Sequence, residues 1–298
     1  MLRTAGVVKR WGTTVALNGA TMAIGPGVTG LLGANGSGKT TLLGLFLGLT
    51  KPDAGRIQVL GLDPFKAGAK VRARVGYSPE HHLLPADVKA YDLVRHVAEL
   101  HGLPHREATA RASDALFQVG LGEERLRPIG TMSTGQRQRV KLAQAIVHDP
   151  VLVLLDEPTE GLDPVQRDDM LGLIRRIGSD FGIHVLLSSH VLDEVERVAD
   201  HAVILHQGRV VAAGTLDDLR LGGRGMVVEI DGDTDLVVEA LRRSGCSVVV
   251  EGLNVRVSRG DDDVADLVRD VLAHYGVSVR KLNRQALTLE DVFLGAYQ

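Results

Sequence analysis

The chain has 298 residues, of which 44% are hydrophobic and 24% are charged, with a formal net charge of −3. This composition fits a globular protein with one large and one small domain, and it lacks the basic excess of a nucleic-acid-binding protein. Cys246 is the only cysteine, which excludes a disulfide within the chain and favours a reducing compartment. The sequence shows no run of the roughly 20 apolar residues that a membrane helix requires, so any membrane-spanning component is expected on another polypeptide.

The N-terminal region predicts strands on either side of an exposed aromatic residue. Short alternating runs at 5–9 and 14–24 predict an antiparallel β layer. Between them lies Trp11, the only tryptophan, whose flat face could stack on a purine ring. The apolar run Val28 to Leu32 then predicts a buried strand.

A glycine-rich stretch directly follows that buried strand and opens an apolar helix expected over 41–47. It reads Gly33-Ala34-Asn35-Gly36-Ser37-Gly38-Lys39-Thr40-Thr41. The pattern G-x-x-x-x-G-K-S/T between a strand and a helix is typical of a phosphate-binding loop, in which backbone N–H groups and the helix N-terminus bind phosphate. Lys39 is expected to reach the β- and γ-phosphates, and the Thr40 hydroxyl to bind Mg²⁺. The stretch therefore predicts a nucleoside triphosphate site.

The next part of the chain predicts strands over 56–60 and 75–80, the second ending in a loop at Glu80, and then helices over 88–101 and 106–119. A further helix is expected from Ser133 to about 148. Ser133 is a suitable N-cap, and Gln136 three residues later completes the pattern of a capping box. The same small, exposed helix N-terminus could instead bind a second anion. Both interpretations stay open at this stage.

Acidic residues and a histidine follow two further apolar runs. The run 151–155 predicts a buried parallel strand that ends at Asp156 and Glu157, where open α/β sheets bind ligands. Asp156 suits Mg²⁺ coordination, and Glu157 suits polarising an attacking water. Asp163 and the proline after it predict the start of a helix. The strand expected at 183–187 ends near His190, which could reach a γ-phosphate.

The last part of the chain predicts a separate small domain. A hairpin at 202–213 is followed by a glycine-rich linker at 222–225. From 226 the pattern predicts strand, helix, strand, strand, helix, strand and a short final helix at 289–294. This order is a split βαβ arrangement of the ferredoxin-like type.

Taken in order, these motifs resemble the nucleotide-binding subunits of ATP-binding-cassette (ABC) transporters over residues 2–220. The resemblance implies an α/β P-loop cassette over 1–221, with a RecA-like parallel core, an antiparallel β layer and a helical subdomain at about 82–148. An accessory α+β domain of ferredoxin-like order would occupy 226–298. The family motifs correspond to the following residues: Walker A at 33–40, Walker B with its catalytic glutamate at 151–157, the signature at 132–136, the D-loop at 161–163, the switch residue His190 and the adenine-stacking Trp11.

The resemblance also implies a mechanism that uses ATP and Mg²⁺. Two cassettes, as a homodimer or with a paralogue, would close head to tail over two ATP molecules. Each ATP would contact the Walker A loop of one subunit and the signature and D-loop of the other, which are represented by Ser133, Gly135, Gln136 and Asp163. Glu157 would activate water, His190 and Lys39 would hold the γ-phosphate, and Thr40, Asp156 and Glu80 would bind the metal. Glu80 departs from the glutamine that is usual in the family, although its carboxylate still offers an oxygen.

These expectations lead to a main function and one alternative. The main hypothesis is an ATPase subunit that drives export through a separate membrane permease. This subunit is expected in the cytoplasm, bound through its permease to the cytoplasmic face of the membrane. The alternative is a soluble, non-transport cassette that acts on nucleic acid or ribosomes. That alternative usually implies two cassettes in one chain, a long coiled coil or a basic patch. None of these features is visible in the sequence, so no nucleic-acid partner is expected.

Overall fold

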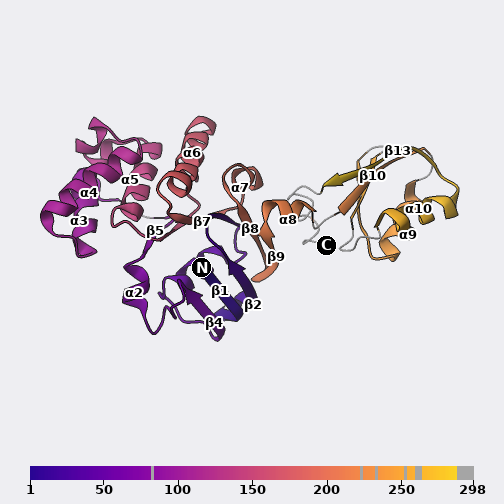
Figure 1. Cartoon of the computed structure of the whole chain (residues 1–298), viewed down its shortest axis with the longest axis horizontal. Coiled ribbons are helices and arrows are strands. Elements are labelled where there is room, and N and C mark those ends of the chain that lie inside the picture. Colours follow the sequence, from indigo (N-terminus) through magenta and orange to yellow (C-terminus); the bar gives the residue numbers. More distant parts are fainter. Residues whose placement is uncertain (82–83, 222–223, 232–233, 252–253, 259–263, 287–298) are drawn as a thin grey trace. The chain divides into compact units, whose positions relative to one another are not determined.

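The computed structural model describes residues 1–81, 84–221, 224–231, 234–251, 254–258 and 264–286, and it divides into two compact units, residues 1–213 and 214–298 (Figure 1). The glycine pair of the expected linker and the helix expected at 289–294 lie outside the described residues. Among the helices that are described, none combines the length and the apolar character needed to cross a bilayer. The domain boundary expected at residue 221 stays a prediction.

A six-stranded sheet forms the centre of the first unit, and the neighbouring pairs from β5 to β8 are parallel. Its central strands are buried along their whole length, which is why they read as continuous apolar runs. The strands in sheet order are β5 (Val75–Ser78), β6 (Leu152–Asp156), β7 (His184–Ser189), β3 (Val28–Leu32), β8 (His201–His206) and β9 (Arg209–Thr215).

The site is positioned by the carboxyl ends of three adjacent strands. β6 ends at Asp156, β7 ends at Ser189, and β3 ends at Leu32 before the glycine-rich loop. β7 reaches Ser189, two residues beyond the expected end, because Ser189 pairs with Leu32. Parallel strands end at the same edge of a sheet, so their following residues meet there. The helices after these three strands are α1 (Lys39–Phe46), α6 (Pro164–Asp180) and α7 (Leu192–Val198).

An antiparallel layer packs against the parallel core, as the N-terminal alternation predicts. It consists of β1 (Leu2–Trp11), β2 (Thr14–Ile24) and β4 (Ala54–Val59), in the order β2-β1-β4. Inward-facing side chains of this layer, including Leu2 and Leu17, share one hydrophobic cluster with Leu42 and Phe46 of α1. The short helix α2 (Gly68–Arg72), which the sequence pattern does not indicate, follows β4.

A group of helices is inserted between β5 and β6 (Figure 1). The helices of this insertion are α3 (Ala90–Leu100), α4 (His105–Gln118), η1 (Glu123–Leu126), η2 (Ile129–Thr131) and α5 (Thr134–Ile146). Val94 and Ala98, which recur at helical spacing in the sequence, are buried on α3. The α/β fold class with a parallel core, an antiparallel layer and a helical insertion is therefore confirmed.

The second unit has the ferredoxin-like order expected for the tail. After α8 (Leu216–Leu221), its four-stranded sheet has the order β11-β12-β10-β13, with antiparallel neighbours, and it builds a core of its own. β10 begins two residues before the expected position because Arg224 and Gly225 already pair with neighbouring strands. The elements of this sheet and its helices are β10 (Arg224–Asp231), α9 (Thr234–Arg243), β11 (Ser247–Glu251), β12 (Asn254–Ser258), α10 (Val264–Tyr275) and β13 (Ser278–Ala286).

Candidate nucleotide-binding and catalytic site

The glycine-rich loop links β3 to α1, and two of its glycines, Gly33 and Gly38, have no room for a side chain. Gly38 is the N-cap of α1 with a φ of 109°, and a Cβ there would lie 2.4 Å from the carbonyl oxygen of Ala16. A Cβ on Gly33 would lie 2.4 Å from the Ser37 hydroxyl oxygen. Only glycine therefore allows the tight backbone path that presents N–H groups to a phosphate.

A cavity of about 400 Å³ opens at this loop and includes most of the predicted phosphate-binding residues. It is lined by Thr14, Ala16, Asn35, Gly36, Gly38, Lys39, Thr40, Thr41, Glu80 and Glu157. Residues from four segments of the chain, namely β2, the loop, the segment after β5 and the segment after β6, thus meet at one cavity. Its size and polar lining suit a phosphate chain.

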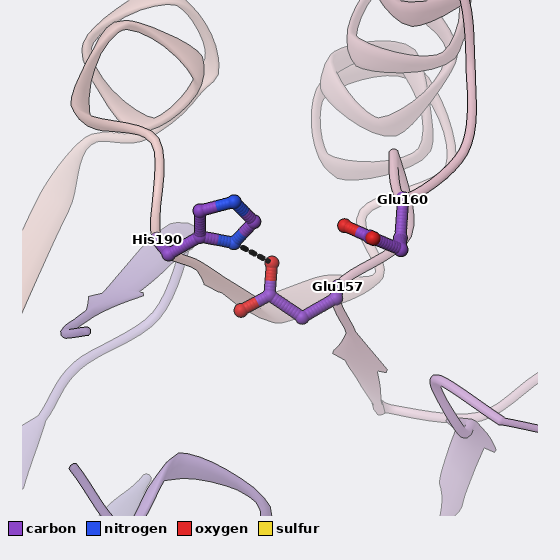
Figure 2. A group of neighbouring side chains, drawn as sticks. All are labelled: Glu157, Glu160 and His190. Carbon is purple, nitrogen blue, oxygen red and sulfur yellow. Dashed lines mark hydrogen bonds and ion pairs between the residues drawn. The ribbon is translucent and has the colours of Figure 1, made fainter. Parts of the chain in front are cut away.

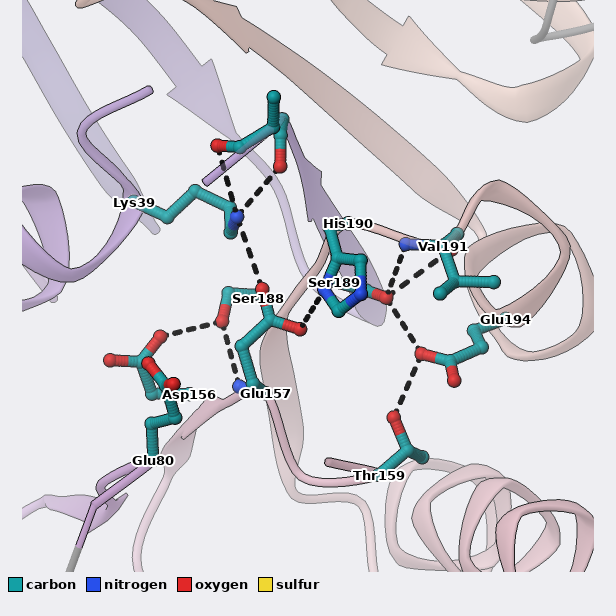
Figure 3. A network of polar contacts seen from close by, with 12 residues as sticks. Lys39, Glu80, Asp156, Glu157, Thr159, Ser188, Ser189, His190, Val191 and Glu194 are labelled. Atoms are coloured by element: carbon teal, nitrogen blue, oxygen red, sulfur yellow. Dashed lines mark hydrogen bonds and ion pairs between the residues drawn. The ribbon is translucent and has the colours of Figure 1, made fainter. Parts of the chain in front are cut away.

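The centre of the site is a chain of contacts from Lys39 through Glu157 to His190. Figure 2 shows the contact of Glu157 with His190, and Figure 3 shows all three side chains. The buried Lys39 ammonium donates to the carbonyl of Gly33 at 2.6 Å and lies 3.0 Å from Oε1 of Glu157. The other oxygen of Glu157 lies 2.9 Å from Nδ1 of His190. The three residues predicted to be catalytic therefore form one chain of contacts. Lys39 and Glu157 are the buried members of this chain, and their charges are opposite.

Glu157 is held at this point by a strained turn that starts at the end of β6. Its φ is 46°, a left-handed value that is uncommon for a residue with a side chain. Its backbone N–H donates to the Ser188 hydroxyl at 2.9 Å, and that hydroxyl donates to Oδ1 of Asp156 at 2.7 Å. Ser188 thus fixes both acids. Ser188 was not predicted as a site residue, and its role follows from its position opposite Asp156 in the β6–β7 pairing.

The acids at this edge of the sheet fit a divalent cation. Oδ2 of Asp156 is buried and has no hydrogen-bond partner among the described residues. Burial, together with the nearby charges of Asp156 and Glu80, raises the pKa of Tyr77 to about 12. The charges of Asp156 and Glu80 thus both act near Tyr77, and Thr40 lines the same cavity as Glu80. Oxygen donors of this kind are those that Mg²⁺ prefers.

A third buried acid, Glu194 on α7, connects the loops around it by its hydrogen bonds (Figure 3). It accepts hydrogen bonds from the hydroxyls of Thr159 at 2.8 Å and Ser189 at 2.6 Å, and Arg167 lies 3.3 Å from its other oxygen. These contacts connect the loop after β6 to the end of β7. Glu194 was not predicted from the sequence, because nothing in its spacing distinguishes it from an ordinary surface acid of a helix.

Glu160 lies beside this centre, and its ligand atoms and those of Glu157 and His190 are within 4.8 Å of one another (Figure 2). Both oxygens of Glu157 already face cations or hydrogen-bond partners, Lys39 on one side and His190 on the other. The grouping is thus accounted for by the phosphate site itself.

The signature segment forms the expected capping box. The Gln136 N–H donates to the Ser133 hydroxyl at 3.2 Å, and the Ser133 N–H donates to Oε1 of Gln136 at 3.1 Å. Gly135 packs so closely on α6 that a Cβ would lie 2.9 Å from Oε1 of Gln166, whose N–H is in turn capped by Asp163 at 2.9 Å. As far as the described residues go, none of these signature and D-loop residues lines the cavity at Lys39.

Trp11 lies at the end of β1, opposite Thr14 in the hairpin, and is 51% exposed. The Lys9 ammonium lies 4.7 Å from the centre of its ring. Trp11 does not belong to the described lining of the cavity, whereas its partner Thr14 does. The indole is therefore close to the phosphate site and accessible, and its contact with adenine stays a prediction.

The fold and the site together define a P-loop nucleotide-binding domain of the cassette type. The family model described as "ABC transporter" matches residues 17–160. The linearmycin resistance ATP-binding protein LnrL of Bacillus subtilis (strain 168) is 31% identical over 99% of this chain and 97% of its own length. The chain therefore belongs to the ABC transporter family as an ATP-binding subunit. It binds ATP and is an ATPase.

Two further comparisons agree with this assignment. The Nod factor export ATP-binding protein I of Ralstonia nicotianae (strain ATCC BAA-1114 / GMI1000) is 32% identical over 99% of this chain and 92% of its own length. A solved structure of the ATP-binding subunit of an ABC transporter is 30% identical and has a TM-score of 0.65, covering 74% of this chain and 92% of that one.

Proposed function

We propose that this ATPase subunit drives export by a separate membrane permease, and that its catalytic centre is formed by Lys39, Glu157 and His190. The observation that carries the catalytic assignment is the contact chain from Lys39 through Glu157 to His190 at the mouth of the glycine-rich loop. Bound Mg²⁺ would supply neutralisation of phosphate charge, held by Thr40, Asp156 and Glu80.

The protein's own residues would act by positioning and by moving one proton. The backbone of residues 33–41 binds the phosphate chain, and Lys39 binds its β- and γ-oxygens. Glu157 turns from Lys39 toward the attacking water and accepts its proton, while His190 holds the γ-phosphate in line. Trp11 stacks on the base. Phosphoryl transfer depends mainly on the positions and charges of the groups around the phosphate. A small displacement of Glu157 toward the water is therefore enough to begin hydrolysis.

The complete site would need a second cassette. Ser133, Gly135, Gln136 and Asp163 present a capped helix start and a loop that belong, by family membership, at the ATP of a partner copy. Their absence from the described lining of the chain's own cavity supports this assignment. We infer head-to-tail pairing, with a second copy of this chain or with a paralogue, around two ATP molecules.

The export direction is supported by the names of the relatives, which include a resistance protein and a Nod factor export protein. The subunit would then lie on the cytoplasmic face of the membrane, bound to its permease. Affinity purification from detergent-solubilised membranes tests this: recovery of a multi-span membrane protein is expected. Recovery of ribosomes or DNA in its place would favour the alternative of a soluble cassette.

The catalytic assignment is tested by Lys39→Ala in a steady-state ATPase assay. We expect the rate to fall by at least about a hundredfold, because loss of a preorganised charge on the transferred phosphoryl group costs several kcal/mol. Lys66→Ala, which removes an exposed lysine away from the cavity, is the matched control and should retain the wild-type rate. Equal rates for the wild type and Lys39→Ala would overturn the assignment.

A further inference from the structure

A buried lysine outside the recognised motifs contacts the backbone that carries Glu80. Lys141 lies on α5, about two helical turns after Gly135, and is only 8% exposed. Its ammonium donates to the carbonyl oxygens of Glu80 at 2.8 Å and of Pro79 at 3.3 Å. It therefore joins the helix that begins at the signature segment to the loop that ends β5.

The cost of burying this ammonium indicates that the contact is specific. Burial lowers the pKa of Lys141, and the nearby charge of Glu80 opposes that shift. A buried charge is tolerated only when it is paired or hydrogen-bonded, and here two carbonyls and one carboxylate provide the compensation. Lys141 also lines a separate cavity of about 370 Å³ with Tyr77, Arg72 and His148. Beside that cavity its ammonium is hydrogen-bonded to the backbone of the loop that carries Glu80.

The position of Glu80 gives this contact a functional meaning. Glu80 lines the phosphate cavity together with Lys39 and Thr40, and its backbone carbonyl accepts a hydrogen bond from Lys141. Among the described residues, the ion-pair partner of the Glu80 side chain is His81, whose ring is 86% exposed and whose Nε2 lies 3.0 Å from Oε1. The backbone contact with Lys141 is therefore the better-buried restraint on where the Glu80 carboxylate lies.

We propose that Lys141 is a positioning residue that fixes the Glu80 carboxylate at the metal side of the phosphate cavity. This inference rests on the proposed role of Glu80 as a metal ligand. Lys141 touches neither nucleotide nor metal, and it acts through the backbone of Pro79 and Glu80. Because it is anchored in α5, it also makes the placement of Glu80 depend on the helix that begins at Ser133.

The test measures metal affinity directly, with Mn²⁺ in place of Mg²⁺ and a non-hydrolysable ATP analogue. Free Mn²⁺ is followed by electron paramagnetic resonance in the full-length wild type, Lys141→Met, Glu80→Ala and the double variant. Lys141→Met keeps an unbranched side chain that is one heavy atom shorter, and it removes the charge and the donors. We expect about a tenfold weaker Mn²⁺ affinity, as for other residues that orient a metal ligand.

The double variant separates positioning from a general loss of structure. If Lys141 acts through Glu80, then Lys141→Met has no further effect on Mn²⁺ affinity once Glu80 is alanine. Additive losses, or wild-type Mn²⁺ affinity in Lys141→Met, would overturn the proposal. Arg139→Met is the matched control, because Arg139 lies on the same helix and donates to the carbonyl of Val119 at 2.8 Å; it should bind Mn²⁺ as the wild type does.

Two further measurements make the outcome decisive. Lys141→Gln, whose amide can still donate one hydrogen bond, serves if the methionine variant does not fold, and an intermediate loss of Mn²⁺ affinity is expected from it. A wild type that binds the nucleotide equally well with and without Mn²⁺ would instead contradict the proposed function. Metal-dependent binding with no effect of either Lys141 variant would contradict only the role of Lys141.

Discussion

At the scale of single residues, Ser188 shows how one hydroxyl can organise two acids. It accepts from the Glu157 N–H and donates to Asp156, and it is fully buried. Removing it leaves a buried N–H and a buried carboxylate oxygen without their partner, which costs about 1–3 kcal/mol. The turn that directs Glu157 toward Lys39 loses its restraint at the same time.

Ser188→Ala should therefore lower kcat of ATP hydrolysis by about ten- to a hundredfold with a smaller change in KM. Steady-state kinetics and a thermal melt measure the two effects. Ser189→Ala is the matched control, since the Ser189 hydroxyl donates to Glu194, whereas Ser188 contacts Asp156 and Glu157. It should lose comparable stability but less kcat, and a kcat loss equal to that of Ser188→Ala would count against the role of Ser188.

A second prediction at this scale concerns pH. His148 stacks on His101 with ring centres 3.6 Å apart. Burial, and then the charge of His101, lower the pKa of His148 from 6.5 to about 4, with the charge of Asp149 opposing. Between pH 6.5 and 4 the unfolded chain binds a proton that the folded chain does not. Stability is therefore unaffected by this group above pH 6.5 and falls as the pH drops through that window.

His148→Gln removes the titrating ring. On going from pH 8 to pH 5, its free energy of unfolding should fall by about 2 kcal/mol less than that of the wild type, since one pKa unit corresponds to about 1.4 kcal/mol. Urea unfolding at the two pH values measures the difference. His96→Gln, which changes a largely exposed ring, should behave as the wild type does. Identical pH dependence in His148→Gln would contradict the prediction.

At the scale of elements, the start of helix α5 has two possible roles, as a capped helix end and as an anion site, and the sequence left both open. Its capping box is present, so Ser133 has a structural role. The proposed role at a partner's ATP is additional. A side chain that caps equally well but carries a negative charge can separate the two roles.

Ser133→Ala should lower stability by about 1 kcal/mol, because the cap is lost. Ser133→Asp should restore that stability, since aspartate is an equally good N-cap and its charge favours a helix N-terminus. The same charge should repel phosphate and leave ATPase activity low. Chemical denaturation without nucleotide and an ATPase assay are the two measurements. Full activity in Ser133→Asp would show that Ser133 only caps the helix.

Elements with a strong pattern could be predicted from the sequence. β3 was predicted with its observed bounds, Val28–Leu32, and the α/β class and the ferredoxin-like order were right because buried runs and turn residues carry that information. The short helix α2 was not predicted, because five residues hold too little periodicity. Ser188, Glu194 and Lys141 were not predicted as part of the site, because their importance depends on pairings between distant segments.

At the scale of the whole molecule, the two units carry one natural reporter each. Trp11, the only tryptophan, lies in the unit of residues 1–213, and Cys246, the only cysteine, is buried in the unit of residues 214–298. The two cores consist of separate clusters of side chains. Each unit can thus be followed in the intact chain.

Saturating ATP analogue should raise the denaturant midpoint seen by Trp11 fluorescence, because a ligand of the folded state stabilises it by mass action. The rate at which a thiol reagent labels Cys246 should stay the same within about twofold. The unliganded protein measured under the same conditions is the reference. Equal protection of both reporters would mean that the two units unfold together.

The contact between Lys39 and Glu157 bears on when Glu157 can act as a general base. The buried Glu157 carboxylate pairs with the Lys39 ammonium, so the proposed general base contacts the very group that is proposed to receive the triphosphate. An incoming nucleotide has to exchange places with this internal anion. Under the proposed mechanism, the bound triphosphate would release Glu157 from Lys39, so Glu157 would become available to accept a proton from water only when the substrate is in place.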